Sequence, residues 1–178
     1  VGATLALADA IRASSGAEVV VAADVPYRYA WMTGADKIIA NDEVQGPFDV
    51  AVVMDGDRHR LAPGVEEAYV AAGKKVVVDH HRTTDTDGYD LAILDHNAAA
   101  TCVQVLEILD AWEVDLTQAI AEVLYVGLIY DTGGFRYSNT KPQTHVAASR
   151  LLATGIDHAS IASRVLMEVR PQGMRLKT

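Results

Sequence analysis

Two short and almost continuous aliphatic runs, each ending abruptly in an aspartate, most strongly limit the folds open to this chain. Residues 48–54 lead into Asp55, and residues 75–78 lead into Asp79. Strands that are apolar at nearly every position are typical of a parallel sheet covered by helices on both faces. The carboxyl ends of parallel strands share one edge, where open α/β sheets bind ligands. We therefore expect Asp55 and Asp79 to lie together at a candidate site.

Strand-like and helical patterns alternate through the first half of the chain, and the second half is helical. We expect strands at residues 18–23, 37–40, 48–54, 75–78 and 90–94, and helices at 2–14, 63–72, 98–112, 116–130, 142–153 and 157–169, with a helical turn at 26–32. The predicted fold is an open, mostly parallel α/β sheet of about five strands with helices on both faces, followed by a helical segment.

Composition and charge exclude several classes of protein. The formal net charge of −9 argues against binding to long duplex nucleic acid, which normally requires a basic surface. No apolar run approaches the roughly 20 residues that span a bilayer, so we expect no membrane contact and a cytoplasmic location. The single cysteine, Cys102, lies in an apolar helical run, and we expect a buried core thiol. An acidic protein can still bind phosphates through divalent cations.

The Asp79-His80-His81 run follows a predicted buried strand. Adjacent side chains of an extended backbone point to opposite sides, so one histidine can bind a metal while the other faces a substrate. A neighbouring carboxylate can fix the tautomer of a metal-bound imidazole. A solvated turn is the alternative for a bare histidine pair, and a helix cap is the alternative for a lone aspartate. Their position after a strand favours a metal site.

A third acidic position, Asp131, ends an apolar helical run and is followed by Gly133, Gly134 and Arg136. Glycine permits close approach of the backbone to a ligand. The planar guanidinium of Arg136 suits phosphate oxygens, although an arginine that covers the core with its aliphatic stem is the alternative. This segment is therefore a candidate phosphate-binding loop.

Along nearly its whole length the chain resembles the DHH phosphoesterase family, and within it the NrnA-like branch of bacterial oligoribonucleases and phosphoadenosine-phosphate phosphatases. The resemblance is carried by VGATLALADAI, VVMDGDRHRL, the name-giving DHH, HNAAATC and GLIYDTGGFRYSNT. It implies that Asp55 bridges two metal ions, that Asp131 is a second shared carboxylate and that His80 is a metal ligand. It also implies that His81 contacts the substrate phosphate or assists catalysis, while Asp79 orients the histidines.

The resemblance further implies the ligands of the site. Thr101 and Arg136 are similar in position to residues that help to hold the substrate. The usual metal is manganese, here two Mn²⁺ ions with Mg²⁺ as the alternative, and carboxylates with imidazole suit such an ion. The implied substrates are short oligoribonucleotides, linear or cyclic dinucleotides and 3′-phosphoadenosine 5′-phosphate. A homodimer is the implied assembly.

Two parts of the family pattern are not found in this sequence. A His-x-x-Pro-Asp-x-Asp motif at the end of a first strand should precede Val1, and a second, DHHA1 domain should follow Thr178. We therefore expect residues 1–169 to form a DHH catalytic domain without its first strand and first metal motif. Residues 170–178 are expected to begin a linker, and the chain as given is expected to be inactive.

Several other functions share parts of this pattern. A family II pyrophosphatase or exopolyphosphatase would be similar up to the DHH run, but GGFRYSNT favours the nucleotide-cleaving branch. A RecJ-like exonuclease is disfavoured by the acidity of the chain. A non-catalytic nucleotide-binding module would have lost the first motif. A flavodoxin-like regulatory domain would leave the Asp79-His80-His81 run without a role.

Overall fold

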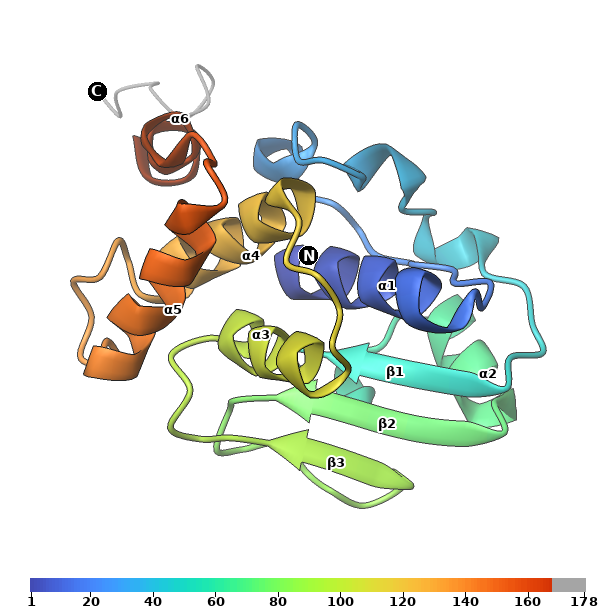
Figure 1. The fold of residues 1–178 in the computed structure, drawn as a ribbon. Helices are drawn as coiled ribbons and strands as arrows, with labels where there is room; N and C mark the ends of the chain where they lie inside the picture. Colours follow the sequence, from blue (N-terminus) through green and yellow to red (C-terminus); the bar gives the residue numbers. More distant parts are fainter. Residues whose placement is uncertain (168–178) are drawn as a thin grey trace, which may run out of the picture.

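A parallel sheet forms the middle layer of the computed structural model, which describes residues 1–167 (Figure 1). Its strands are β1 (Val50–Met54), β2 (Lys74–Asp79) and β3 (Leu91–Leu94), in the order β1-β2-β3. Met54 pairs with Val78, and Asp79 pairs with Leu94. Because this register brings the carboxyl ends of β1 and β2 level with each other, the residues that follow them start from the same edge.

Helices lie before, between and after the strands and are joined by loops. The α-helices are α1 (Gly2–Ser15), α2 (Pro63–Ala71), α3 (Thr101–Ala111), α4 (Gln118–Asp131), α5 (Pro142–Ala153) and α6 (His158–Ala162). Short helical turns are η1 (Tyr27–Tyr29), η2 (Ala35–Lys37), η3 (Asn41–Glu43), η4 (Arg58–Arg60) and η5 (Ser163–Met167). None of the helices within residues 1–167 is long and apolar enough to cross a membrane.

Alternate side chains of the central strands pack into two different cores. Val78 belongs to the large cluster that includes α1, α3 and α4, with Val52 packed against it. Val53 and Val77 pack instead with Tyr69 of α2. Figure 1 shows α3 in front of the sheet and α2 behind it. The expected parallel α/β fold with helices on both faces is confirmed, since successive strand residues point to opposite sides.

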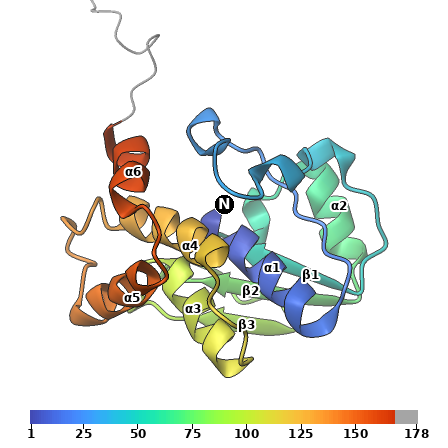
Figure 2. The same cartoon turned by 45° about the horizontal axis from the view of Figure 1, so that its top comes forward.

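The last helices of the described chain lie at one end of the sheet. Figures 1 and 2 show α5 and α6 beyond the carboxyl ends of the strands, with α4 between them and α1. The amino terminus of α1 lies on this same side of the sheet. The segments that carry Asp55, Asp79 and Asp131 therefore meet where the α/β part and the helical part adjoin.

Helix α4 is packed closely on its neighbours through two glycines. A Cβ atom at Gly127 would lie 2.2 Å from the Sγ atom of Cys102 in α3, and a Cβ atom at Gly2 would lie 2.2 Å from the carbonyl oxygen of Val123. Both distances are too short for a side chain, so glycine sets the separation of these helices. Cys102 is buried, as expected, and burial raises the pKa of its thiol.

Within the described residues the sheet has three strands, fewer than the expected number of about five. Residues 18–23 and 37–40 meet only in one parallel bridge between Ala22 and Ile39. A cavity of about 600 Å³ is lined both by residues 19–21 and by β1, with Leu7 and Ile11 of α1 covering it. The cavity separates residues 19–21 from the edge of β1. These two segments therefore do not pair with the sheet as further strands.

Most of the remaining elements match the expected ones with small shifts at their ends. The helix expected at 157–169 is instead divided into α6 (His158–Ala162) and the π-helical η5 (Ser163–Met167), and residues 168 and 169 lie outside the described residues. The helix expected at 98–112 begins at Thr101, because Ala100 is extended (φ −161°, ψ 152°). Residues 98–100 thus form a loop, and its carbonyl oxygens are used at the site described below. The expected linker at 170–178 lies outside the described residues.

Replacing Gly127 by alanine should destabilise the fold, because the new methyl group would overlap Cys102 Sγ. Overpacking of this kind costs about 1–3 kcal/mol of unfolding free energy, measurable by chemical denaturation. Gly56→Ala is the control, since a Cβ atom there meets no atom within 4 Å. Adding Cys102→Ala to Gly127→Ala should recover part of the loss. If Cys102→Ala were equally harmful in both backgrounds, this contact would not set the helix separation.

Candidate metal centre

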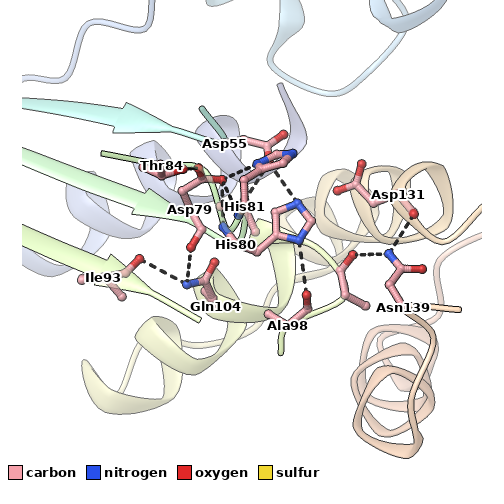
Figure 3. A network of polar contacts seen from close by, with 12 residues as sticks. Asp55, Asp79, His80, His81, Thr84, Ile93, Ala98, Gln104, Asp131 and Asn139 are labelled. Atoms are coloured by element: carbon pink, nitrogen blue, oxygen red, sulfur yellow. Dashed lines mark hydrogen bonds and ion pairs between the residues drawn. The ribbon is translucent and has the colours of Figure 1, made fainter. Parts of the chain in front are cut away.

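Four side chains from the carboxyl edge of the sheet form one acid–histidine cluster, consisting of Asp55, Asp79, His80 and His81 (Figure 3). Asp55 follows β1, Asp79 is the last residue of β2, and the two histidines come next. One ligand atom from each residue can be chosen so that all four lie within 4.8 Å of one another. The parallel register of β1 and β2 explains how residues from separate segments meet.

The carboxylate of Asp55 is held in place from two directions. Its backbone is left-handed (φ 59°), a conformation that non-glycine residues adopt mainly at turns and functional sites. The hydroxyl of Thr101 donates to Asp55 Oδ1 at 2.8 Å, and His80 Nε2 lies 3.6 Å from the same oxygen. The Asp55 side chain remains 38% exposed, so an ion can reach it.

The ring of His80 is oriented by the loop before α3. Its Nδ1 lies 3.2 Å from the carbonyl oxygen of Ala98, which can only accept a hydrogen bond. The proton is therefore placed on Nδ1, and Nε2 is left with a lone pair directed toward Asp55. A backbone carbonyl that fixes the tautomer in this way is typical of metal-bound histidines.

Asp79 is fully buried and organises the turn that carries the histidines. Its carboxylate accepts from the backbone N–H groups of His80 and His81, from Thr84 Oγ1 and from His81 Nδ1 at 2.7 Å. Burial opposes ionisation of Asp79, but the hydrogen bonds from Thr84 and His81 outweigh it and lower its pKa. Asp79 therefore orients the ring of His81, whereas Ala98 orients that of His80.

The hydrogen bond to Asp79 is also the main reason that the pKa of His81 is raised, an effect that partial burial opposes. The nearby carboxylates of Asp55 and Asp131 act in the same direction. His81 therefore keeps a proton more readily than a free histidine does. Its side chain is 49% exposed, so its Nε2 atom can contact a ligand.

Asp131, the last residue of α4, approaches the cluster from the helical part of the molecule. Figure 3 shows it on the other side of the histidine rings from Asp79. Asp55 and Asp131 line one cavity of about 210 Å³. Burial, with the charge of Asp55, raises the pKa of Asp131 to about 6, although His80 and His81 act against this. A nearby cation would relieve this concentration of negative charge.

Three polar residues that the sequence did not single out hold the site together. Asn139 Nδ2 donates to the carbonyl oxygens of Asp131 (3.0 Å) and Ala99 (2.9 Å), which joins the end of α4 to the loop before α3. Gln104 Nε2 donates to the carbonyl oxygen of Asp79 at 3.0 Å. Gln104 could have been recognised from the sequence, because it is a polar residue on the apolar side of a predicted helix. Thr84 and Asn139 lie in loops, where no such pattern exists.

The two expected substrate-binding residues lie in different surroundings. Thr101 is buried and lines the 210 Å³ cavity, but its hydroxyl is bonded to Asp55. Arg136 is exposed, and its Nε–H donates to the carbonyl oxygen of Gly133 at 2.6 Å. The structure thus places Thr101 at the cluster and leaves Arg136 outside it. Their roles in holding a substrate stay predictions.

The donor set fits a divalent cation that prefers oxygen and imidazole ligands. Carboxylates and a histidine with a free Nε2 offer ligand atoms within 4.8 Å of one another, and the nearby thiol of Cys102 is buried with a raised pKa. Thiolate-seeking ions need an ionised cysteine, which this environment disfavours. Asp55 and His80 can therefore be ligands of such an ion, with Thr101 orienting the first and Ala98 the second. Asp131 lines the same cavity as Asp55 and can approach the ion from there.

Asp131→Asn should stabilise the metal-free protein at pH 8 but not at pH 4. Because the folded pKa of Asp131 is raised, folding favours its protonated form, and stability is lost as pH rises from about 4 to about 6. The asparagine escapes this loss, which is on the order of 2 kcal/mol. Denaturation in the presence of a chelator measures it, with the exposed Asp24→Asn as control. Equal effects of Asp131→Asn at both pH values would contradict the assigned environment.

Comparison with known proteins agrees with this geometry. Residues 1–128 match the family described as the DHH family, N-terminal domain. The chain is 29% identical over 171 residues to the bifunctional oligoribonuclease and PAP phosphatase NrnA of Thermus thermophilus, covering 96% of this chain and 50% of that protein. A probable enzyme of the same name from Streptococcus mutans is 27% identical, covering 76% of this chain and 42% of that protein. The chain thus spans about half the length of these relatives.

Two solved structures share the fold. An exopolyphosphatase-related protein from Bacteroides fragilis superimposes with a TM-score of 0.84 at 24% identity, covering 98% of this chain and 54% of that one. A putative family II inorganic pyrophosphatase from Methanococcus jannaschii gives a TM-score of 0.67 at 14% identity, covering 92% of this chain and 58% of that one. At these identities the likeness shows the fold alone. With the family match over residues 1–128, the acid–histidine cluster and the fold agree that this chain belongs to the DHH family.

Proposed function

We propose that this chain is the catalytic core of a two-metal phosphoesterase that hydrolyses short nucleotides. The substrates would be short oligoribonucleotides, linear or cyclic dinucleotides and 3′-phosphoadenosine 5′-phosphate. The observation that carries the proposal is the convergence of ligand atoms from Asp55, Asp79, His80 and His81 within 4.8 Å. Asp131 lines one cavity together with Asp55. The names of the relatives in Thermus thermophilus and Streptococcus mutans support nucleotide substrates rather than inorganic phosphates.

We propose two Mn²⁺ ions as the cofactor, held by Asp55, His80 and Asp131 together with ligands from outside this chain. When bound, such ions supply a water molecule of lowered pKa and neutralise charge on the phosphoryl group. Oxygen and imidazole donors suit Mn²⁺, and Mg²⁺ is the alternative with the same oxygen preference.

His81 is the residue best suited to act directly on the substrate. Its Nδ1 is bonded to Asp79, and its raised pKa favours the protonated ring. A protonated histidine beside a phosphoryl group stabilises charge on its oxygens or gives a proton to the leaving oxygen. Asp79 keeps the ring in place for this task, while Thr101 keeps the Asp55 carboxylate facing His80.

We also propose that a further strand completes the sheet beside β1 and brings additional metal ligands. The cavity of about 600 Å³ supports this, because it is mostly apolar and is lined by residues 19–21 and by β1, the edge strand of the sheet. A strand there, parallel to β1, would end near Val1 and Asp55, which line one cavity. A crystal structure of the full-length protein in which this space stays empty would contradict the proposal.

The homodimer and the cytoplasmic location stay predictions.

The assigned chemistry predicts which substrates the full-length protein cleaves. With Mn²⁺, it should hydrolyse a linear diadenylate and 3′-phosphoadenosine 5′-phosphate in preference to pyrophosphate. Asp55→Ala should reduce turnover at least about 100-fold, since it removes a carboxylate from the metal site. Cleavage of pyrophosphate alone would favour a pyrophosphatase, binding without cleavage would favour a nucleotide-binding module, and activity unchanged by Asp55→Ala would overturn the site.

Metal binding can be tested apart from activity. Titration calorimetry with Mn²⁺ should show that Asp55→Ala and His80→Ala weaken binding about tenfold or more, since loss of a metal ligand or its support costs on this order. His158→Ala is the matched control, because this exposed histidine begins α6, away from the cluster. A loss of affinity in His158→Ala equal to that in His80→Ala would mean that Mn²⁺ binds elsewhere.

A further inference from the structure

The cavity lined by Asp55 and Asp131 has polar and aromatic residues in its lining. Asp55, Asp131 and Thr101 are its polar residues, beside which metal and phosphate would lie. Tyr29 and Tyr130 line the same cavity. Aromatic residues add nothing to the binding of an inorganic phosphate, which has no ring to stack on them.

Tyr130 occupies an unusual position for a large ring. It directly precedes Asp131 at the end of α4, yet it is 50% exposed in a helix whose other large side chains are mostly buried. Exposure of one apolar ring is ordinary by itself. At Tyr130 the ring borders the cavity that contains the carboxylates, so its free face is available to whatever binds there.

The ring of Tyr29 packs against the ring of Tyr130. The two rings are 5.9 Å apart between centroids and meet edge to face at 86°. Tyr29 lies in the turn η1, fixed by hydrogen bonds from its own N–H to the carbonyl oxygen of Pro26 (2.8 Å) and from Met32 N–H to its carbonyl oxygen (3.0 Å). Edge-to-face contact fixes the orientation of the Tyr130 ring, which lowers the entropic cost of stacking a ligand on it.

We propose that Tyr130, supported by Tyr29, binds the nucleobase of the nucleotide whose phosphate lies at Asp55 and Asp131. This inference rests on the proposed function and names a specificity-determining residue within it. The cavity of about 210 Å³ is smaller than the roughly 300–1,000 Å³ of typical ligand pockets, so a dinucleotide bound there would extend beyond it.

The chemistry of the contact also limits what it can distinguish. Every nucleobase has a π-face, so stacking on tyrosine separates nucleotides from inorganic phosphates without selecting one base. Tyr130 thereby accounts for a site that accepts adenylates and oligoribonucleotides of mixed sequence. Stacking on Tyr130 cannot strengthen the binding of pyrophosphate, because pyrophosphate has no ring.

The test compares two ligands that differ only in the base. Adenosine 5′-monophosphate and ribose 5-phosphate are titrated calorimetrically into the full-length protein with Mn²⁺. The unsubstituted protein should bind the nucleotide about tenfold more tightly, the value expected for one stacked base. Tyr130→Leu, which keeps apolar bulk, should remove this preference and leave the ribose 5-phosphate affinity within about twofold. Tyr130→Phe should keep it, because the ring face remains.

Two controls separate this inference from the proposed function. Tyr27→Ala changes a tyrosine of the same turn that is 72% exposed and does not line the cavity, so the base preference should persist. Asp131→Asn should weaken both ligands alike, because it alters a polar residue beside which the phosphate would lie. Failure of Asp131→Asn to affect either ligand, or no binding of either, would overturn the proposed function and this inference with it. A Tyr130→Leu protein that still prefers the nucleotide tenfold would overturn the inference alone.

Discussion

The register between β1 and β2 is the constraint on which the candidate site depends. Met54 lies opposite Val78, so the chain leaves both strands at the same level, and Asp55 and Asp79 emerge side by side. A slip of one residue would turn alternate side chains to the opposite face, moving Val53 and Val77 out of contact with Tyr69. The two cores on either side of the sheet therefore fix the position of the edge that carries the acid–histidine cluster.

Electrostatic balance explains how the cluster is divided into tasks. Asp79 is buried but satisfied by hydrogen bonds, so it remains ionised and supports His81. Asp131 is buried with too few donors around it and lies near Asp55, so its pKa rises to about 6. The Asp79 carboxylate thus orients other protein groups, whereas a bound cation would stabilise the ionised Asp131 carboxylate. Neighbouring acids with opposite pKa shifts are typical of functional sites.

The fold is shared with proteins whose names refer to different phosphate compounds, so the architecture alone does not decide the substrate. The substrate depends on the groups around the carboxylates of the site. Here the loop of residues 98–100, held by Asn139, positions His80, and the ring of Tyr130 borders the cavity beside Asp131. These features belong to the helical segment and its loops.

The sequence alone determined the parallel α/β class and the meeting of Asp55 with the Asp79-His80-His81 run, because apolar strands that end in acidic residues place them at one edge. Two expected strands became a single bridge, since the pattern of a short apolar run does not reveal whether a pairing strand lies beside it.

Only the tertiary structure decided that Ala98 orients His80, that Thr101 holds Asp55, and that Arg136 lies outside the cluster. It also decided the close packing of Gly127 on Cys102 and the meeting of Tyr29 with Tyr130. These contacts join residues far apart in the chain, or depend on a backbone carbonyl, and neither leaves a periodic signal in the sequence. Local pattern sets the elements, whereas the partners of each side chain depend on how the elements pack.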